Sequence, residues 1–193
     1  MNRIAFHDRR LIVTVPHKAG STSFQAATVP GLAEVAKHTN VHVGDAAVSY
    51  WRAIGVGPLS FADVYRDYPN YRRLMAVREP VSRFMSTWDD FCLKQRVPGD
   101  WHWLRGMSQA QFMDLIEGCP GGDPHWWPQA FISLSDSEYI PCDRLLTYLE
   151  LEDAHLHTGV RDERTTPDPQ VIERIQKHYA RDFELWEIAK RFE

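Results

Sequence analysis

The alternation of apolar and polar positions along the chain predicts buried strands that lead through tight turns into helices. Residues 11–15 (LIVTV) and 74–77 (LMAV) are short, almost continuous apolar runs, as expected of strands buried on both faces. Pro16 ends the first run, and Gly20 and three hydroxyl residues then open a helical segment. A charged turn ends the second run, where Pro80 suits the first turn of the next helix.

Helix-start signals and apolar spacing predict most of the other elements. Ser60 and Ser108 each begin a capping pair, and residues 145–151 have the leucine spacing of a short helix. Asp168 and Pro169 predict the start of one last helix. Its apolar face is expected to contain Ile172, Ile175, Tyr179, Phe183 and Trp186.

These elements predict an α/β fold of three layers, with a central, mainly parallel sheet flanked by helices. Residues 41–43 (VHV) are expected to form another short strand. The chain has 193 residues and contains no repeat or linker, so residues 1–193 are expected to form one domain.

Charge and cysteine content narrow the class of function. Lys and Arg number 22 against 26 Asp and Glu, which argues against a nucleic-acid binder because such proteins need a basic face. The three cysteines, Cys92, Cys119 and Cys142, form no CxxC pair and indicate neither disulfides nor a zinc site. The sequence shows no signal peptide and no apolar run of about 20 residues. We therefore expect a soluble, cytoplasmic protein, of an oligomeric state that the sequence does not predict.

Residues 15–23 (VPHKAGSTS) give the first signal for anion binding. A loop between a buried strand and a helix offers unpaired N–H groups and the positive end of the helix dipole. Gly20 allows close approach of an anion, and Lys18 adds a positive charge. Lys18 precedes Gly20, whereas a Walker A loop has its lysine after the second glycine. The alternative interpretation is an ordinary helix cap beside a surface lysine.

Residues 78–86 (REPVSRFMS) give the second signal. Arg78 follows the end of a strand, and Ser86 lies two turns into the next helix. Open α/β sheets bind ligands at the carboxyl ends of adjacent strands, so both segments are expected to face one site. A guanidinium suits a phosphate because it donates two parallel hydrogen bonds. Alone, an arginine before a proline more often belongs to a solvated turn.

In this order, PHKAGSTS and REPVSRFMS resemble the sulfotransferases that depend on 3′-phosphoadenosine 5′-phosphosulfate (PAPS). Residues 123–129 (DPHWWPQ) and 179–183 (YARDF) are similar to segments of the membrane-type carbohydrate sulfotransferases, here as a soluble form without their anchor. The resemblance implies a P-loop-like fold and transfer of a sulfuryl group from PAPS to a hydroxyl of a saccharide or glycoconjugate. It departs from the family at Ala19, where relatives often carry a polar residue.

The resemblance also implies the donor site. The lysine-glycine-hydroxyl loop would hold the 5′-phosphosulfate, Arg78 and Ser86 would hold the 3′-phosphate, and no metal would be needed. Lys18 is expected to stabilise charge on the leaving oxygen. The implied donor-binding residues are His17, Lys18, Ala19, Gly20, Ser21, Thr22, Ser23, Arg78 and Ser86.

The acceptor hydroxyl needs a base, which the sequence leaves open. Histidine is the first candidate because its ordinary pKa lies near 6.5. His42 is favoured as the base, because the strand expected at residues 41–43 would place it near the anion loop. Lys18 and His42 are then the two expected catalytic residues. The alternatives are His38, His125 and the carboxylates Glu79, Asp89 and Asp90.

Five of the seven tryptophans lie between residues 88 and 127, which suggests either a sugar-binding cleft or core packing. Residues 101–103 (WHW), expected to be a loop, are the better cleft candidate. Two other functions stay open. One is a kinase-like P-loop nucleotide enzyme, disfavoured by the lysine position, and the other is a non-catalytic nucleotide- or anion-binding module without a base.

Overall fold

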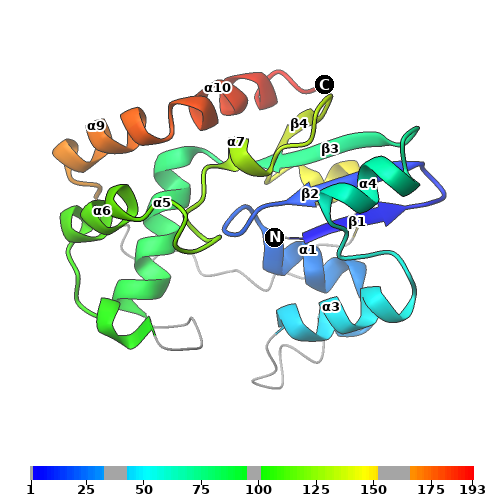
Figure 1. Cartoon of the computed structure of the whole chain (residues 1–193), viewed down its shortest axis with the longest axis horizontal. Coiled ribbons are helices and arrows are strands. Elements are labelled where there is room, and N and C mark those ends of the chain that lie inside the picture. The colour runs from blue at the N-terminus through cyan, green and yellow to red at the C-terminus, as the bar shows by residue number, and fades with distance from the viewer. Residues whose placement is uncertain (1, 33–42, 95–100, 152–165) are drawn as a thin grey trace.

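A four-stranded sheet forms the centre of the computed structural model, which describes residues 2–32, 43–94, 101–151 and 166–193 (Figure 1). The strands lie in the order β1 (Asn2–Phe6), β2 (Leu11–Val15), β3 (Arg72–Val77) and β4 (Glu138–Pro141). β2, β3 and β4 are parallel, and β1 pairs antiparallel with β2. The predicted α/β fold with a mainly parallel sheet is therefore confirmed. The edge strands β1 and β4 were not predicted.

Helices cover both faces of the sheet because successive strand residues point to opposite sides. On one face, Val13 and Val15 pack with Phe24 and Trp51; on the other, Ile12 packs with Val64 and Leu134. The first face carries α1 (Ser21–Thr28), α3 (Val43–Ala53) and α8 (Leu145–Tyr148). The second carries α4 (Phe61–Asp67), α7 (Gln129–Ile132) and α10 (Ala180–Ala189).

A second apolar cluster lies beside the carboxyl ends of the strands (Figure 1). It is built from α5 (Pro80–Trp88), the π-helix η1 (Asp89–Leu93), the 3-10 helix η2 (Trp101–Leu104), α6 (Gln109–Gly118) and α9 (Pro169–His178). Residues 101–103, expected to be a loop, belong to η2. In the described residues no helix is long and apolar enough to cross a membrane.

The prediction of one continuous last helix is wrong. The chain forms α9 and α10, which are separated at Tyr179, where φ is −106° and ψ is 29°. The Tyr179 hydroxyl donates to the carbonyl of Trp126 at 2.7 Å, and Asp182 is fully buried. The break lets both polar side chains point into the protein. Which residues of α9 and α10 are buried therefore depends on tertiary hydrogen bonds as well as on apolar spacing.

The strand expected at residues 41–43 is not found at Val43, the last of these residues. Val43 begins α3, and both edges of β2 are occupied by β1 and β3. His42 itself, like His38, lies outside the described residues.

Asp182 connects α10 to the segments that follow the carboxyl ends of the strands. Its carboxylate accepts the N–H groups of Gln129 at 2.7 Å and Ala130 at 2.8 Å. Burial raises the pKa of Asp182, and these hydrogen bonds oppose the increase. The Gln129 side chain in turn holds the Arg78 backbone, donating to its carbonyl at 2.9 Å and accepting from its N–H at 3.0 Å.

We expect Asp182→Asn to destabilise the protein by about 2 kcal/mol, because the amide leaves one backbone N–H unpaired and adds a buried donor. For a chain of this length the melting temperature should fall by about 4–8 °C. Glu184→Gln, at an exposed position of the same helix, is the control in thermal unfolding and should change little. Equal melting temperatures for both variants would contradict the role given to Asp182.

Candidate functional site

The loop between β2 and α1 contains two residues in the left-handed backbone region. Lys18 and Gly20 both have positive φ, 63° and 79°, which is costless for the glycine and uncommon for the lysine. α1 begins without a side-chain cap, so residues 21–23, which are half-buried, leave first-turn N–H groups for a ligand. Ala19 is fully buried, which explains why this position is small and apolar.

Two arginines from the second predicted segment hold this loop. Arg78 donates from Nη1 to the Lys18 carbonyl at 2.8 Å, and Arg83 donates from Nε to the His17 carbonyl at 3.1 Å. Arg83 also donates from Nη2 to the carbonyl of His125 at 3.1 Å. The structure thus brings together the segments around residues 18 and 78, as expected from strand order, and adds the segment around residue 125.

Lys18 forms an ion pair with Asp90, the second residue of the π-helix η1. Both side chains are largely buried, with 16% and 23% of their surface exposed. Asp89, its neighbour in the same helix, instead pairs with Lys94 at 2.8 Å, and that lysine is 41% exposed. The two adjacent carboxylates therefore face different surroundings, and Asp90 is the one directed to the anion loop.

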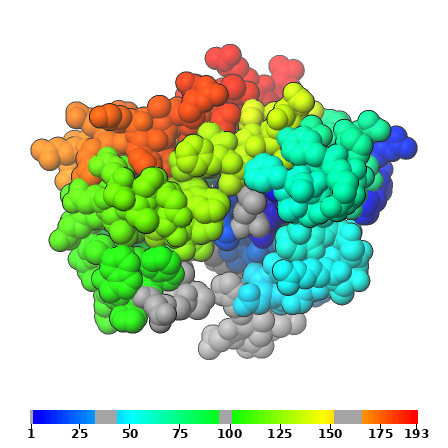
Figure 2. All heavy atoms as spheres, in the orientation of Figure 1, coloured from blue at the N-terminus to red at the C-terminus, as the bar shows by residue number. Residues whose placement is uncertain are grey.

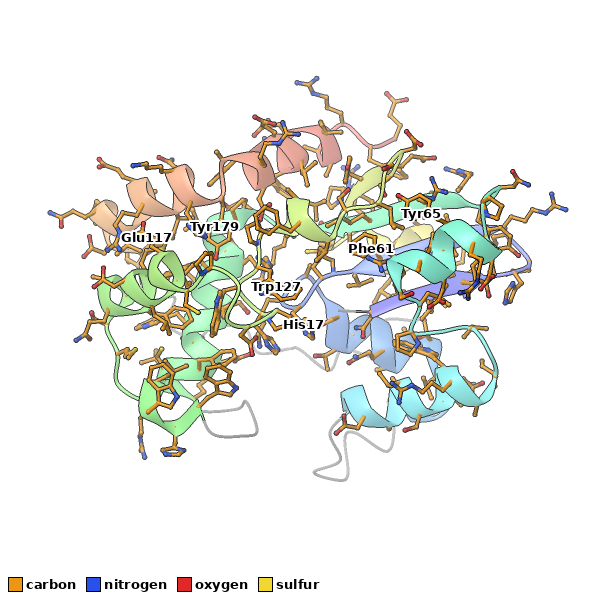
Figure 3. The ribbon with its side chains drawn as sticks, in the orientation of Figure 1. His17, Phe61, Tyr65, Glu117, Trp127 and Tyr179 are labelled. Carbon is orange, nitrogen blue, oxygen red and sulfur yellow. The ribbon has the colours of Figure 1, made fainter. Side chains whose placement is uncertain are left out.

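Two histidine rings contact each other near this ion pair, with their planes tilted by 40°. The centroids of His17 and His125 are 4.2 Å apart, and Figure 3 shows His17 between the sheet and the second cluster of helices. Nδ1 of His125 lies 2.6 Å from Oδ1 of Asp123, which also accepts the backbone N–H of His125 at 2.8 Å. Burial raises the pKa of Asp123, but its hydrogen bonds to His125 outweigh burial and lower it.

His17 is held in its neutral form. Burial lowers its pKa to about 2, and the nearby positive charges of Arg83 and Lys18 act in the same direction. In Figure 2 the surface is hollowed between the yellow-green atoms and the cyan atoms. A neutral ring at this position adds no further positive charge beside Lys18 and Arg83.

The other predicted residues are placed as follows. Ser86 lies half-buried in α5, two turns after Arg78. Glu79 is the N-cap of α5, and its two carboxylate oxygens accept the N–H groups of Val81 and Ser82 at 2.9 and 2.6 Å, so it is engaged in capping. Trp126 is a core residue, whereas Trp103 is half exposed. Within the described residues, no group of three ligating side chains could hold a metal.

Sequence reasoning missed the position of Arg83 and the pairings of Asp90 and Asp123. The spacing of Arg83 from Arg78 within REPVSRFMS was visible, but its burial was not. Asp123 precedes His125 by two residues, a spacing at which an aspartate can bond to a local backbone N–H. Asp90 had no local signal, because its partner is distant in the sequence.

The depressed pKa of His17 predicts an acid-sensitive stability. Below pH 6.5 the unfolded chain binds a proton at this position and the folded chain does not, so stability falls as the pH falls, by up to about 1.4 kcal/mol per pH unit. His17→Gln should reduce this slope between pH 6.5 and 4.5 in denaturant titrations. His7→Gln, at an exposed position, should retain it. Parallel curves for the wild type and His17→Gln would contradict the buried neutral ring.

Comparison with known proteins adds no relative to this picture. No family model, no curated protein sequence and no solved structure matches the chain. The resemblance to the sulfotransferases therefore rests on the quoted motifs, and the function has to be argued from the geometry of the site.

Proposed function

We propose that this protein is a PAPS-dependent sulfotransferase with a P-loop-like donor site, which transfers a sulfuryl group to a hydroxyl of a saccharide. The observation that carries the proposal is the hydrogen bond from Arg78 to the Lys18 carbonyl. It joins the two anion-binding segments at the carboxyl ends of β2 and β3, next to an uncapped helix. This is the position at which open α/β sheets bind ligands.

The donor set fits an anion that carries two separate phosphate-type groups. The first-turn N–H groups of α1 and the Lys18 ammonium would hold one group, and Arg78 with Ser86 would hold the other. At Gly20, the one described atom near an added Cβ is the Cys142 carbonyl oxygen, at 3.8 Å. The positive φ, not a lack of space, is therefore what favours glycine at this position. These positions favour a nucleotide bisphosphate over a ligand with a single anionic end.

In the transfer, the bond between sulfur and the leaving phosphate oxygen breaks, a bond between sulfur and the acceptor oxygen forms, and the acceptor proton goes to a base. Lys18 would stabilise the charge on the leaving oxygen. The N–H groups of α1 would fix the geometry for an in-line displacement, which by analogy with phosphoryl transfer is the main requirement.

We propose His125 as the base, in place of the sequence-favoured His42. Asp123 fixes the His125 ring through Nδ1, and when Nδ1 carries the proton, Nε2 presents its lone pair. Among the described alternatives, Glu79 caps α5, Asp89 is bound to Lys94 and Asp90 is bound to Lys18. Of these described candidates, His125 is thus the one whose ring a carboxylate orients.

A row of aromatic rings leads from the proposed base to the protein surface. Phe91 contacts His125 with ring centroids 5.3 Å apart and Trp101 at 5.9 Å, and Trp101 contacts Trp103 at 6.1 Å. Exposure increases along this row, from 1% at Phe91 to 50% at Trp103. Sugars stack on such exposed indole faces, so Trp103 is the expected outer end of the acceptor site.

Nucleotide selectivity tests the donor assignment. We expect adenosine 3′,5′-bisphosphate to bind at least ten-fold more tightly than adenosine 5′-phosphate, because a charge-assisted guanidinium–phosphate pair contributes about 1.5–3 kcal/mol. Arg78→Ala should remove most of this preference in calorimetry. Arg144→Ala, at an exposed arginine, is the matched control. Equal affinity for the two nucleotides would overturn the proposal, and tighter binding of ATP with Mg²⁺ would favour a kinase-like enzyme.

Activity tests the base, with labelled PAPS and a panel of saccharides. His125→Gln should lower turnover by about 10² to 10⁴ while affinity for adenosine 3′,5′-bisphosphate stays unchanged. Asp123→Asn should lower turnover less and shift the acidic limb of the pH–rate profile, because the carboxylate only positions the ring. His42→Gln is measured alongside. A loss confined to His42→Gln would return the base to the sequence prediction.

A further inference from the structure

Lys18 already has an anionic partner from within the chain. Its ammonium pairs with the carboxylate of Asp90, and both side chains are largely buried. This pairing differs from the surface ion pairs of the protein, such as Arg66 with Asp63, in which the arginine side chain is 66% exposed. A carboxylate and an external anion cannot both take the same position on the ammonium. An external anion at the loop therefore meets an ammonium that already carries the Asp90 carboxylate.

The backbone segments that carry Lys18 and Asp90 are both held in place. Lys18 has a left-handed backbone and its carbonyl is bound by Arg78. Asp90 lies in the π-helix η1, which directly continues α5, and α5 also carries the buried Arg83 that binds the His17 carbonyl. The pairing geometry is thus set by two fixed backbone segments rather than by two free surface side chains.

We propose that Asp90 takes the place of the ligand's anionic group: its carboxylate pairs with the Lys18 ammonium when no ligand is bound. This pairing sets the affinity of the site for anions. A tethered competitor acts at an effective concentration in the millimolar range or above. An incoming anion has to displace it and leave the carboxylate beside the site. The inference uses the proposed function only for the location of the ligand, since any anion at Lys18 would meet the same competitor.

The test compares Asp90→Asn with Asp89→Asn. The two residues are adjacent in η1; Asp90 pairs with Lys18, and Asp89 pairs with Lys94. Calorimetric titration uses adenosine 3′,5′-bisphosphate and, in separate runs, inorganic sulfate. We expect Asp90→Asn to bind both about 5- to 30-fold more tightly than the wild type, since the amide keeps the shape without the charge. Asp89→Asn should bind them as the wild type does.

A double variant shows whether the gain acts through Lys18. In a Lys18→Ala background, Asp90→Asn should gain less than two-fold, because there is no ammonium left to release. Circular dichroism and thermal unfolding check that each variant is folded, and Asp90→Ser replaces Asp90→Asn if the latter is not. Unchanged or weaker anion binding by the folded Asp90 variant would overturn the inference, as would the same gain without Lys18.

The outcomes separate this inference from the proposed function. If Asp90→Asn strengthens sulfate binding while no variant prefers adenosine 3′,5′-bisphosphate over adenosine 5′-phosphate, the competition is supported and the donor assignment fails. If the wild type shows that preference and the Asp90 variant gains nothing, the donor assignment is supported and the competition fails.

Discussion

The buried guanidinium of Arg83 is the contact on which the arrangement of the site depends. Arg83 is 3% exposed and binds the backbone carbonyls of His17 and His125, two residues far apart in the sequence. Burial lowers its pKa, while Tyr179 and Asp182 partly compensate. Removing this side chain would leave two carbonyls without these donors and a void between three segments, so the anion loop and the His125 segment are positioned by one residue.

The charge distribution of the site follows from that contact. Lys18, Arg78 and Arg83 are brought within reach of the same loop, and cations gathered in a poorly hydrated place repel one another. Asp90 offsets part of this repulsion, and His17 stays neutral. A site balanced in this way is stable when empty and still offers N–H donors and cations to a ligand of higher charge.

The sequence predicted the elements whose signals are local. The apolar runs of β2 and β3, the capping pairs at Ser60 and Ser108 and the proline at the start of α5 lie within a few residues of what they determine. The break at Tyr179 depends instead on a hydrogen bond to Trp126, and the role of Asp90 depends on a lysine on another element. Such long-range pairings produce no periodic pattern in the sequence, and they determine how the residues of the candidate site are arranged.

The four segments on which the resemblance to sulfotransferases rests form one hydrogen-bonded unit. In the segment around residue 125, the Trp126 carbonyl accepts a hydrogen bond from the Tyr179 hydroxyl, and the Gln129 N–H donates to the Asp182 carboxylate. Gln129 fixes the backbone of Arg78, whose guanidinium holds the Lys18 carbonyl. The last two helices thus act on the anion loop through hydrogen bonds, although α10 packs on the opposite face of the sheet from α1. Because buried polar groups have to be paired, these hydrogen bonds make the position of the Lys18 carbonyl depend on a helix that lies across the sheet.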